Sequence, residues 1–334
     1  MKKGLAIWVL AIACLPLHAR TIHVKEGGSG NGISWATATN LQYALSIAKA
    51  GDEIWVASGV HTPTTGTDRY ATFQLVEGVS LFGGFTGIES SLDDRNISSN
   101  PTILSGEIGA KNQVSDNVYT VVTAKNVSSQ TIVDGFIITG GNADAIGRVG
   151  EAATSGAAWY NESASPTIRN CAFRGNLANW GAAMFNFAGT QKCSPSILNC
   201  QFTQNKAHMD GGAIYNDGQD GQCTPQIRDC SFEGNIASYG GSVYNTVNNG
   251  TTRPLFLNCI FINNSSMVSG GATGATYDIR KGRGACSSIL NGCRIEENIA
   301  ALQTDNGTTA GQPSTHAQAN STASTGSFTI RGNK

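Results

Sequence analysis

The sequence predicts an all-β protein whose main body is a right-handed parallel β-helix, a solenoid of about nine or ten rungs with a short N-terminal capping helix. Three observations support this: a unit of about 30 residues repeats along the chain, its apolar runs are only three to five residues long, and no segment within the repeats has a helical period. A unit of this size cannot bury its own apolar face, so successive copies must stack strand on strand.

Two motifs recur in phase. Each copy contains a Gly-rich motif of the GGAIYN type and ends with an aromatic residue followed three places later by asparagine. The second motif begins at Phe173, Phe202, Phe232, Phe261 and, in degenerate form, Ile295. Because the spacing is nearly constant, equivalent residues of neighbouring copies should lie side by side in columns.

Residues 1–19 have the pattern of an export signal. Two lysines precede the apolar run Leu5–Ile12, and Leu17–Ala19 is a plausible cleavage site. We therefore expect a secreted or cell-surface, extracytoplasmic protein with no transmembrane segment once the signal is removed. Lipid anchoring at Cys14 is the alternative.

Residues 20–150 are expected to form the N-terminal cap and several irregular rungs. Leu41, Ala44, Leu45 and Ala48 fall on one helical face, with Asn40 before them as a possible cap and Gly51 after them. This helix should cover the exposed lower edge of the first rung. Strands are expected at Thr21–Lys25, Glu53–Ala57, Val79–Phe82, Thr102–Leu104, Tyr119–Thr123 and Ile132–Thr139.

Residues 151–300 should hold the regular repeats, whereas residues 301–334 form a low-complexity tail, with a possible last strand at Ser327–Arg331. Only 13% of residues are charged and the formal net charge is -1. This balance provides no basic patch for a nucleic acid, so we expect no nucleic-acid partner.

Three segments near the start of the chain have a recognisable pattern: Ile22–Lys25, Gly30–Ala36 and Ala50–Gly59. They resemble the opening of secreted bacterial β-helix proteins of the pectate-lyase-like superfamily. The two repeat motifs are similar to those of polymorphic outer membrane proteins. The resemblance implies the β-helix fold, but that superfamily includes lyases, hydrolases and adhesins, so it does not choose a function.

Two sets of cysteines recur with the repeat. Cys171, Cys200, Cys230, Cys259 and Cys293 are expected to point inward as small apolar side chains; disulfides between rungs and a metal site are the alternatives. Cys193 and Cys223 lie one rung apart and are the candidate disulfide.

Three columns of asparagine are expected to be structural, either at left-handed bends or as amides that bond from copy to copy. They contain Asn176, Asn205, Asn235, Asn264 and Asn298; Asn161, Asn186, Asn216 and Asn245; and Asn170, Asn199, Asp229 and Asn258.

Aromatic columns provide the candidate binding residues. Tyr160, Phe185, Tyr215 and Tyr244 alternate with an apolar column, so one of the two columns faces inward and the other outward. If the aromatic column faces solvent, it forms a ladder for stacking on sugar rings. Trp180, Met209, Tyr239 and Val268 form a neighbouring column that either extends the ladder or packs at a corner.

Acidic residues provide the enzyme alternative, which requires clustered carboxylates. Asp210, Asp217, Asp220 and Asp229 are the candidates, with Ca²⁺ as a cofactor only for a lyase. We expect them at different corners of one rung. Binding or adhesion to a polysaccharide or to another surface glycan or protein is therefore the first hypothesis; a polysaccharide lyase or glycoside hydrolase is the second, and a structural module without a ligand is the third.

Overall fold

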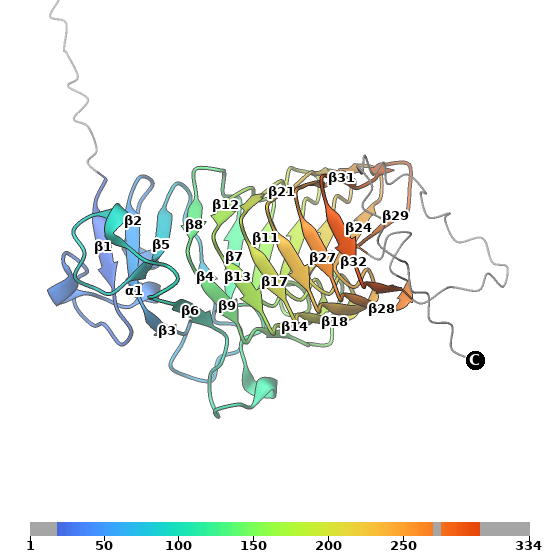
Figure 1. Cartoon of the computed structure of the whole chain (residues 1–334). Coiled ribbons are helices and arrows are strands. Elements are labelled where there is room, and N and C mark those ends of the chain that lie inside the picture. The colour runs from blue at the N-terminus through green and yellow to red at the C-terminus, as the bar shows by residue number, and fades with distance from the viewer. Residues whose placement is uncertain (1–18, 270–274, 301–334) are drawn as a thin grey trace, which may run out of the picture.

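The computed structural model describes residues 19–269 and 275–300, which form a parallel β-solenoid of about 9 turns (Figure 1). All named strand pairs are parallel, and each strand pairs with its counterpart one turn away. The predicted parallel β-helix is therefore confirmed. The export signal, apart from Ala19, the alternative anchor Cys14 and the tail from residue 301 lie outside the described residues.

From β2 onward, each turn contains one strand of sheet A followed by one strand of sheet B. Sheet A contains β1 (Thr21–Val24), β2 (Glu53–Ala57), β5 (Ser80–Phe85), β8 (Ile132–Asp134), β12 (Thr167–Arg169), β16 (Ser196–Leu198), β21 (Gln226–Arg228), β26 (Leu255–Leu257) and β31 (Ile289–Asn291). Sheet B contains β3 (Gly59–His61), β6 (Thr102–Ser105), β9 (Ile137–Thr139), β13 (Ala172–Arg174), β17 (Gln201–Thr203), β22 (Ser231–Glu233), β27 (Ile260–Ile262) and β32 (Arg294–Glu296).

Sheets D and C complete the turn in that order, and a short sheet E follows in three turns. Sheet D contains β10 (Asn142–Ala143), β14 (Leu177–Trp180), β18 (Lys206–Asp210), β23 (Ile236–Tyr239), β28 (Ser265–Ser269) and β33 (Ile299–Ala300). Sheet C contains β4 (Phe73–Gln74), β7 (Val122–Lys125), β11 (Trp159–Glu162), β15 (Met184–Phe187), β19 (Ile214–Asp217), β24 (Val243–Val247) and β29 (Thr276–Arg280). Sheet E contains β20 (Gln222–Cys223), β25 (Thr251–Thr252) and β30 (Ala285–Cys286).

The predicted capping helix is present as α1 (Leu41–Ile47). The side chain of Asn40 accepts a hydrogen bond from the Tyr43 amide at 2.9 Å, as an N-cap residue should. Leu41, Ala44 and Leu45 join the apolar core beside the first strands. The helix therefore closes the N-terminal end of the core. Three short 3-10 helices lie in the N-terminal half: η1 (Trp35–Thr37), η2 (Leu92–Asp94) and η3 (Val114–Asp116).

One predicted strand is divided in the structure. Ile132–Thr139 forms β8 in sheet A and β9 in sheet B, with a corner at Gly135, where φ is +87°. Only glycine adopts this conformation without strain. The apolar pattern was continuous across the corner, because both strands present buried residues to the same core.

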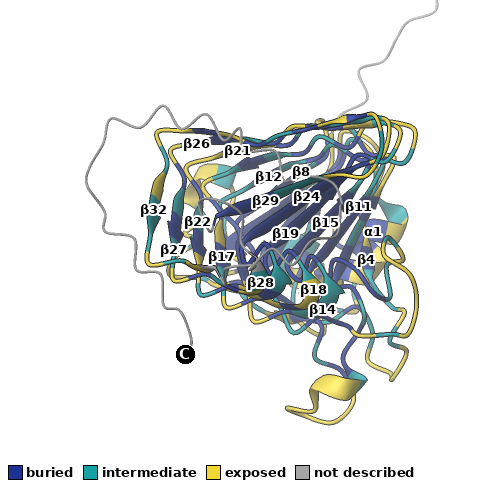
Figure 2. Cartoon of the chain, turned by 90° about the vertical axis from the view of Figure 1, so that its right-hand side faces the viewer, coloured by how far each residue is buried: buried dark blue, intermediate teal, exposed yellow. Residues whose placement is uncertain are grey.

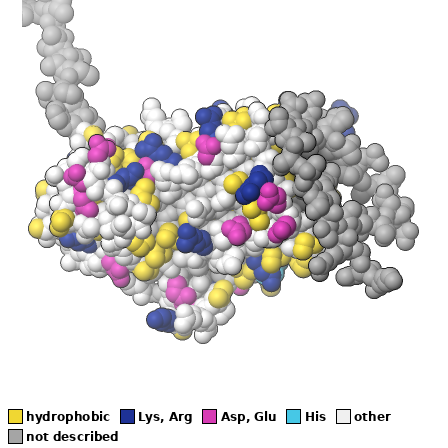
Figure 3. Space-filling view, in the orientation of Figure 1, with side chains coloured by type: hydrophobic (Ala, Val, Ile, Leu, Met, Phe, Trp, Pro, Cys, Tyr) yellow, Lys and Arg dark blue, Asp and Glu magenta, His cyan; other side chains and the backbone are white. Residues whose placement is uncertain are grey.

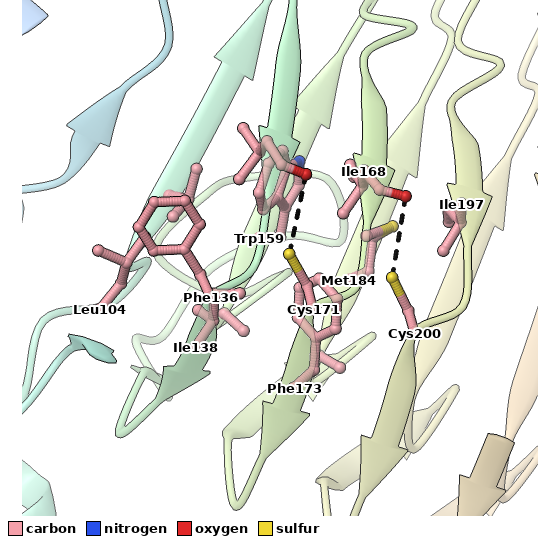
Figure 4. Packing of buried hydrophobic residues seen from close by; sticks show 14 of the residues in the cluster. Leu104, Phe136, Ile138, Trp159, Ile168, Cys171, Phe173, Met184, Ile197 and Cys200 are labelled. Atoms are coloured by element: carbon pink, nitrogen blue, oxygen red, sulfur yellow. Dashed lines mark hydrogen bonds between the residues drawn. The ribbon is translucent and has the colours of Figure 1, made fainter. Parts of the chain in front are cut away.

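The core consists of columns of equivalent side chains that run along the solenoid. Phe173, Phe202, Phe232 and Phe261 stack with ring centroids 4.7–4.8 Å apart. The first cysteine column belongs to this core, and its thiols are free; Figure 4 shows Cys171 and Cys200 with their sulfur atoms directed at backbone carbonyls. The prediction of small, buried apolar side chains is confirmed at Cys171, Cys200, Cys230 and Cys259, whereas Cys293, in the last turn, is only partly buried.

Asparagine ladders cross the regular turns. In the Asn176 column each amide donates to the next asparagine along the chain, at 2.8–3.0 Å, and to a backbone carbonyl. The Asn161 column forms a second buried ladder at 2.7 Å per step, which ends at Asp278. The third column, Asn170, Asn199, Asp229 and Asn258, has φ between 49° and 54° and forms the bend between sheets A and B. The structural role predicted for all three columns is confirmed.

Candidate functional site

The candidate site lies where sheet D continues into sheet C. Asp210 ends β18 and is in register with Trp180 of β14 on one side and with Tyr239 of β23 on the other. All three residues are half-buried. We call this set the aromatic edge; it places a carboxylate between two aromatic side chains on three successive rungs, about 4.8 Å apart.

Glycine permits the sharp turn beside this edge. Gly181, Gly211 and Gly240 follow the three edge residues, with φ between 58° and 69°. A Cβ atom at each position would lie 2.5 Å from the carbonyl oxygen three residues further on. The first glycine of the GGAIYN-type motif is therefore required by backbone geometry.

A bulge brings Asp210 into the edge. β18 has five residues, whereas β14 and β23 have four, and its register shifts between Ala207 and Asp210. His208 and Met209 consequently lie opposite the single residue Asn179, and Met209 is exposed. The predicted column of Trp180, Met209, Tyr239 and Val268 is wrong at its second and fourth places, where the structure has Asp210 and Ser269.

The tyrosine ladder lies next to the aromatic edge but is covered. Tyr160, Phe185, Tyr215 and Tyr244 occupy neighbouring rungs on the outer face of sheet C, as predicted, and Tyr277 continues the column. None of these five side chains is more than 9% exposed, and Trp180 and Tyr239 pack against them. In Figure 2 β11, β15, β19 and β24 are accordingly coloured mostly as buried. The column thus points outward from the core but is not open to solvent, so the condition for a sugar-stacking ladder is not met there. The more accessible aromatic side chains beside it are the half-buried Trp180 and Tyr239.

Asp210 has an unusual environment for a carboxylate. Burial raises its pKa from 3.8 to about 6, against a smaller opposing effect of the positive charge of Lys281. Its negative charge in turn contributes, after burial, to the raised pKa of Tyr244. A carboxylate whose pKa is raised by burial in a surface-accessible position costs stability, and such positions are often functional.

The pH dependence of unfolding should report this cost. Folding raises the pKa of Asp210, so the folded state favours the protonated carboxyl. The stability contributed by this protonated group is fully present below pH 3.8 and is lost as the pH rises through about 6. Asp210→Asn should therefore match the wild type at pH 4 and be more stable at pH 7.5, by about 1 kcal/mol after allowance for partial exposure. Urea denaturation at both pH values measures this. Glu233→Gln, which removes an exposed carboxylate from sheet B, is the control and should show no such gain; an equal difference at both pH values would contradict the interpretation.

The other candidate acids do not converge on Asp210. Asp217 ends β19, is 4% exposed and accepts a hydrogen bond from the Gln219 amide at 2.9 Å; burial raises its pKa. Asp220 accepts amide hydrogen bonds in the following turn, and Asp229 lies at the bend between sheets A and B. These acids occupy different corners, as the sequence predicted. Within residues 19–269 and 275–300, no three His, Cys, Asp or Glu side chains are grouped to hold a metal ion.

The candidate disulfide is not formed in the structure. Cys193 and Cys223 are both free and fully buried, and they pack with Ala188 in a small cluster of their own. Burial raises the pKa of the Cys223 thiol, and the neighbouring Cys193 thiol raises it further. The two cysteines therefore act here as apolar packing residues.

A second surface feature lies on sheet A. A cleft of about 570 Å³ is lined by the loop of residues 92–98 and by Arg169. Its two arginines are already paired with the buried Asp134: Arg95 at 2.8 Å and Arg169 at 2.7 Å. Arg95 also lies over the Phe82 ring. These contacts attach the loop to the solenoid. Because both arginines are already paired, the cleft is a weaker candidate binding site than the aromatic edge.

Charge is scattered over the face shown in Figure 3, where single acidic and basic side chains stand among uncharged ones. In the described part of the chain, no helix has the length and apolar character needed to cross a membrane.

A comparison with protein families finds one match. Residues 199–217 match the model of the Chlamydia polymorphic membrane protein repeat. The matched segment contains β17, β18 and β19, and with them Asp210 and one complete copy of both motifs. Comparisons with curated proteins and with solved structures found no match. This parallel β-helix therefore contains a segment similar to a polymorphic membrane protein repeat, which suggests a protein of the bacterial surface.

Proposed function

We propose that this protein acts at the cell surface or after secretion as a binding protein, and that its aromatic edge binds a polysaccharide. The observation that carries the proposal is the register of Trp180, Asp210 and Tyr239, two half-buried aromatic side chains on either side of a carboxylate. Aromatic rings offer flat apolar surface to sugar rings, and a carboxylate accepts hydrogen bonds from sugar hydroxyls.

The solenoid suits a linear ligand. Successive rungs present their edge residues along one line, and repeat proteins use such lines as extended binding surfaces. The buried tyrosine ladder supports the two half-buried aromatic side chains, because Trp180 and Tyr239 pack directly on it. A site built on packed strands holds its side chains in place better than one on a loop.

Truncation of the two edge aromatics should weaken binding. Trp180→Ala and Tyr239→Ala are each expected to reduce affinity about tenfold, because each removes a stacking surface. The measurement is retention of the protein on a panel of neutral and acidic polysaccharides by affinity electrophoresis. Tyr43→Ala, which removes an exposed tyrosine from α1 at the far end, is the control and should bind as the wild type does. If no polysaccharide retains the wild type, or if both variants bind normally, the proposal is wrong.

The enzyme hypothesis has one observation in its favour, the raised pKa of Asp210 at about 6, which is a property of general acids. Hydrolysis of glycosides normally requires a second carboxylate near the first. The nearest predicted candidate along the chain, Asp217, is buried and engaged with Gln219. Mass spectrometry of polysaccharides incubated with the protein, with and without Ca²⁺, distinguishes the two hypotheses, because shortened or unsaturated chains would indicate an enzyme.

A further inference from the structure

The Asp210 carboxylate has no hydrogen-bond donor among the described residues, neither a side chain nor a backbone amide. Its pKa is raised by burial and lowered, to a smaller extent, by the positive charge of Lys281. The other acids on nearby turns differ in this respect: Asp217 accepts from Gln219, Asp229 from Asn258 and Asp220 from Asn249. A partly buried carboxylate without a partner is better satisfied by a cation than by a neutral group.

The aromatic neighbours favour the same kind of ligand. Trp180 and Tyr239 lie one rung to either side of Asp210. The faces of Trp and Tyr rings attract ammonium groups, and the attraction is stronger where water is excluded. A cation at this edge would therefore meet a negative charge and two aromatic side chains together.

No positively charged side chain of the described residues forms an ion pair with Asp210, so a cationic ligand could do so. Lys281 attracts Asp210 but forms no ion pair with it within 4.0 Å among the described residues. Lys206 and His208 lie on the same strand and are exposed. Tyr215 and Tyr244 approach from sheet C; burial raises the pKa of each hydroxyl, so both remain neutral at physiological pH.

We propose that the aromatic edge binds the ammonium group of an amino sugar within a polysaccharide, with Asp210 as its counter-ion and Trp180 and Tyr239 as stacking surfaces. This inference rests on the proposed function and specifies its ligand class. The two aromatics lie two rungs apart, or about 9–10 Å, a span that fits two sugar rings separated by a third in a linear chain, whereas a single lysine side chain would occupy only one of the aromatics.

The test compares two oligosaccharides of equal length by calorimetry. One is built from N-acetylglucosamine and is neutral; the other is built from N,N,N-trimethylglucosamine and carries a permanent positive charge. At pH 7.5 the cationic oligosaccharide should bind about tenfold more tightly. At pH 5 the preference should fall about tenfold, because Asp210, with a pKa of about 6, is then mostly protonated.

Two variants connect the preference to Asp210. Asp210→Asn keeps the size of the side chain but removes its charge, so the ratio of the two affinities at pH 7.5 should fall about tenfold, whatever happens to the binding of the neutral oligosaccharide. Glu233→Gln, which removes the same charge from an exposed position on β22, should retain the preference. Retention of the preference by Asp210→Asn would overturn the assignment.

The outcomes separate this inference from the proposed function. If the wild type binds both oligosaccharides equally, the ammonium inference is wrong and polysaccharide binding stands. If it binds neither of them and no polysaccharide of the panel, the proposed function is wrong as well. If choline or polylysine competes as effectively as the cationic oligosaccharide, the site recognises an ammonium group without its sugar, and the amino-sugar assignment is wrong.

Discussion

Replacement of Asn235 by alanine should lower the free energy of unfolding by about 3 kcal/mol or more. The Asn235 side chain is fully buried. Its oxygen accepts from the Asn205 backbone amide at 3.1 Å and from the Asn205 side-chain amide at 3.0 Å. Its own amide donates to the Phe202 carbonyl and to the Asn264 oxygen, each at 2.9 Å. Alanine would leave several of these groups buried without a partner, and each such group costs about 1–3 kcal/mol.

Urea denaturation of the full chain measures this loss. Asn249→Ala is the matched control, because it removes the same amide from an exposed turn, where the side chain donates to Asp220. It should change the free energy of unfolding by less than about 1 kcal/mol. If the two variants were equally stable, the ladder would not be the internal support that its geometry indicates.

The repeat explains why much of the fold could be predicted. In a parallel solenoid each residue pairs with its equivalent one turn away, so a constant spacing in the sequence becomes a constant register in space. The stacking of Phe202 on Phe232 and the amide bond from Asn205 to Asn235 both follow from one period. The inward direction of Cys200 follows from alternation along its strand.

The site could be predicted only in part, because its decisive features depart from the repeat. A bulge in β18 puts Asp210 where the spacing placed Met209. Bulges are set by backbone pairing and leave little trace in the residue types. The burial of Tyr215 was missed for a related reason: alternation shows that it points away from Ile214, but not that Trp180 and Tyr239 fold over that side of the sheet.

In the irregular N-terminal turns, the sequence spacing does not predict which side chains meet. Asp134 is in register with Arg169 one turn away, but Arg95 reaches it from a loop outside the strands, 39 residues earlier in the chain. Asp134 accepts from Arg95 at 2.8 Å, from Arg169 at 2.7 Å and from the Asn170 amide at 2.8 Å. The position of Arg95 depends on tertiary packing and not on the strand register, so a single sequence does not reveal the cluster.

Asp134→Ala should therefore destabilise the protein strongly, by about 3–5 kcal/mol. The Asp134 side chain is 1% exposed and that of Arg95 is 13% exposed, so removal of the carboxylate leaves the Arg95 charge in a poorly hydrated position. Glu162→Ala is the control, because its ion pair with Lys125 lies on the surface and should contribute less than about 1 kcal/mol. Urea denaturation compares the two variants. A loss no larger for Asp134→Ala than for Glu162→Ala would mean that the loop of residues 92–98 is held by its packing, with Arg95 over the Phe82 ring, and not by the buried charge.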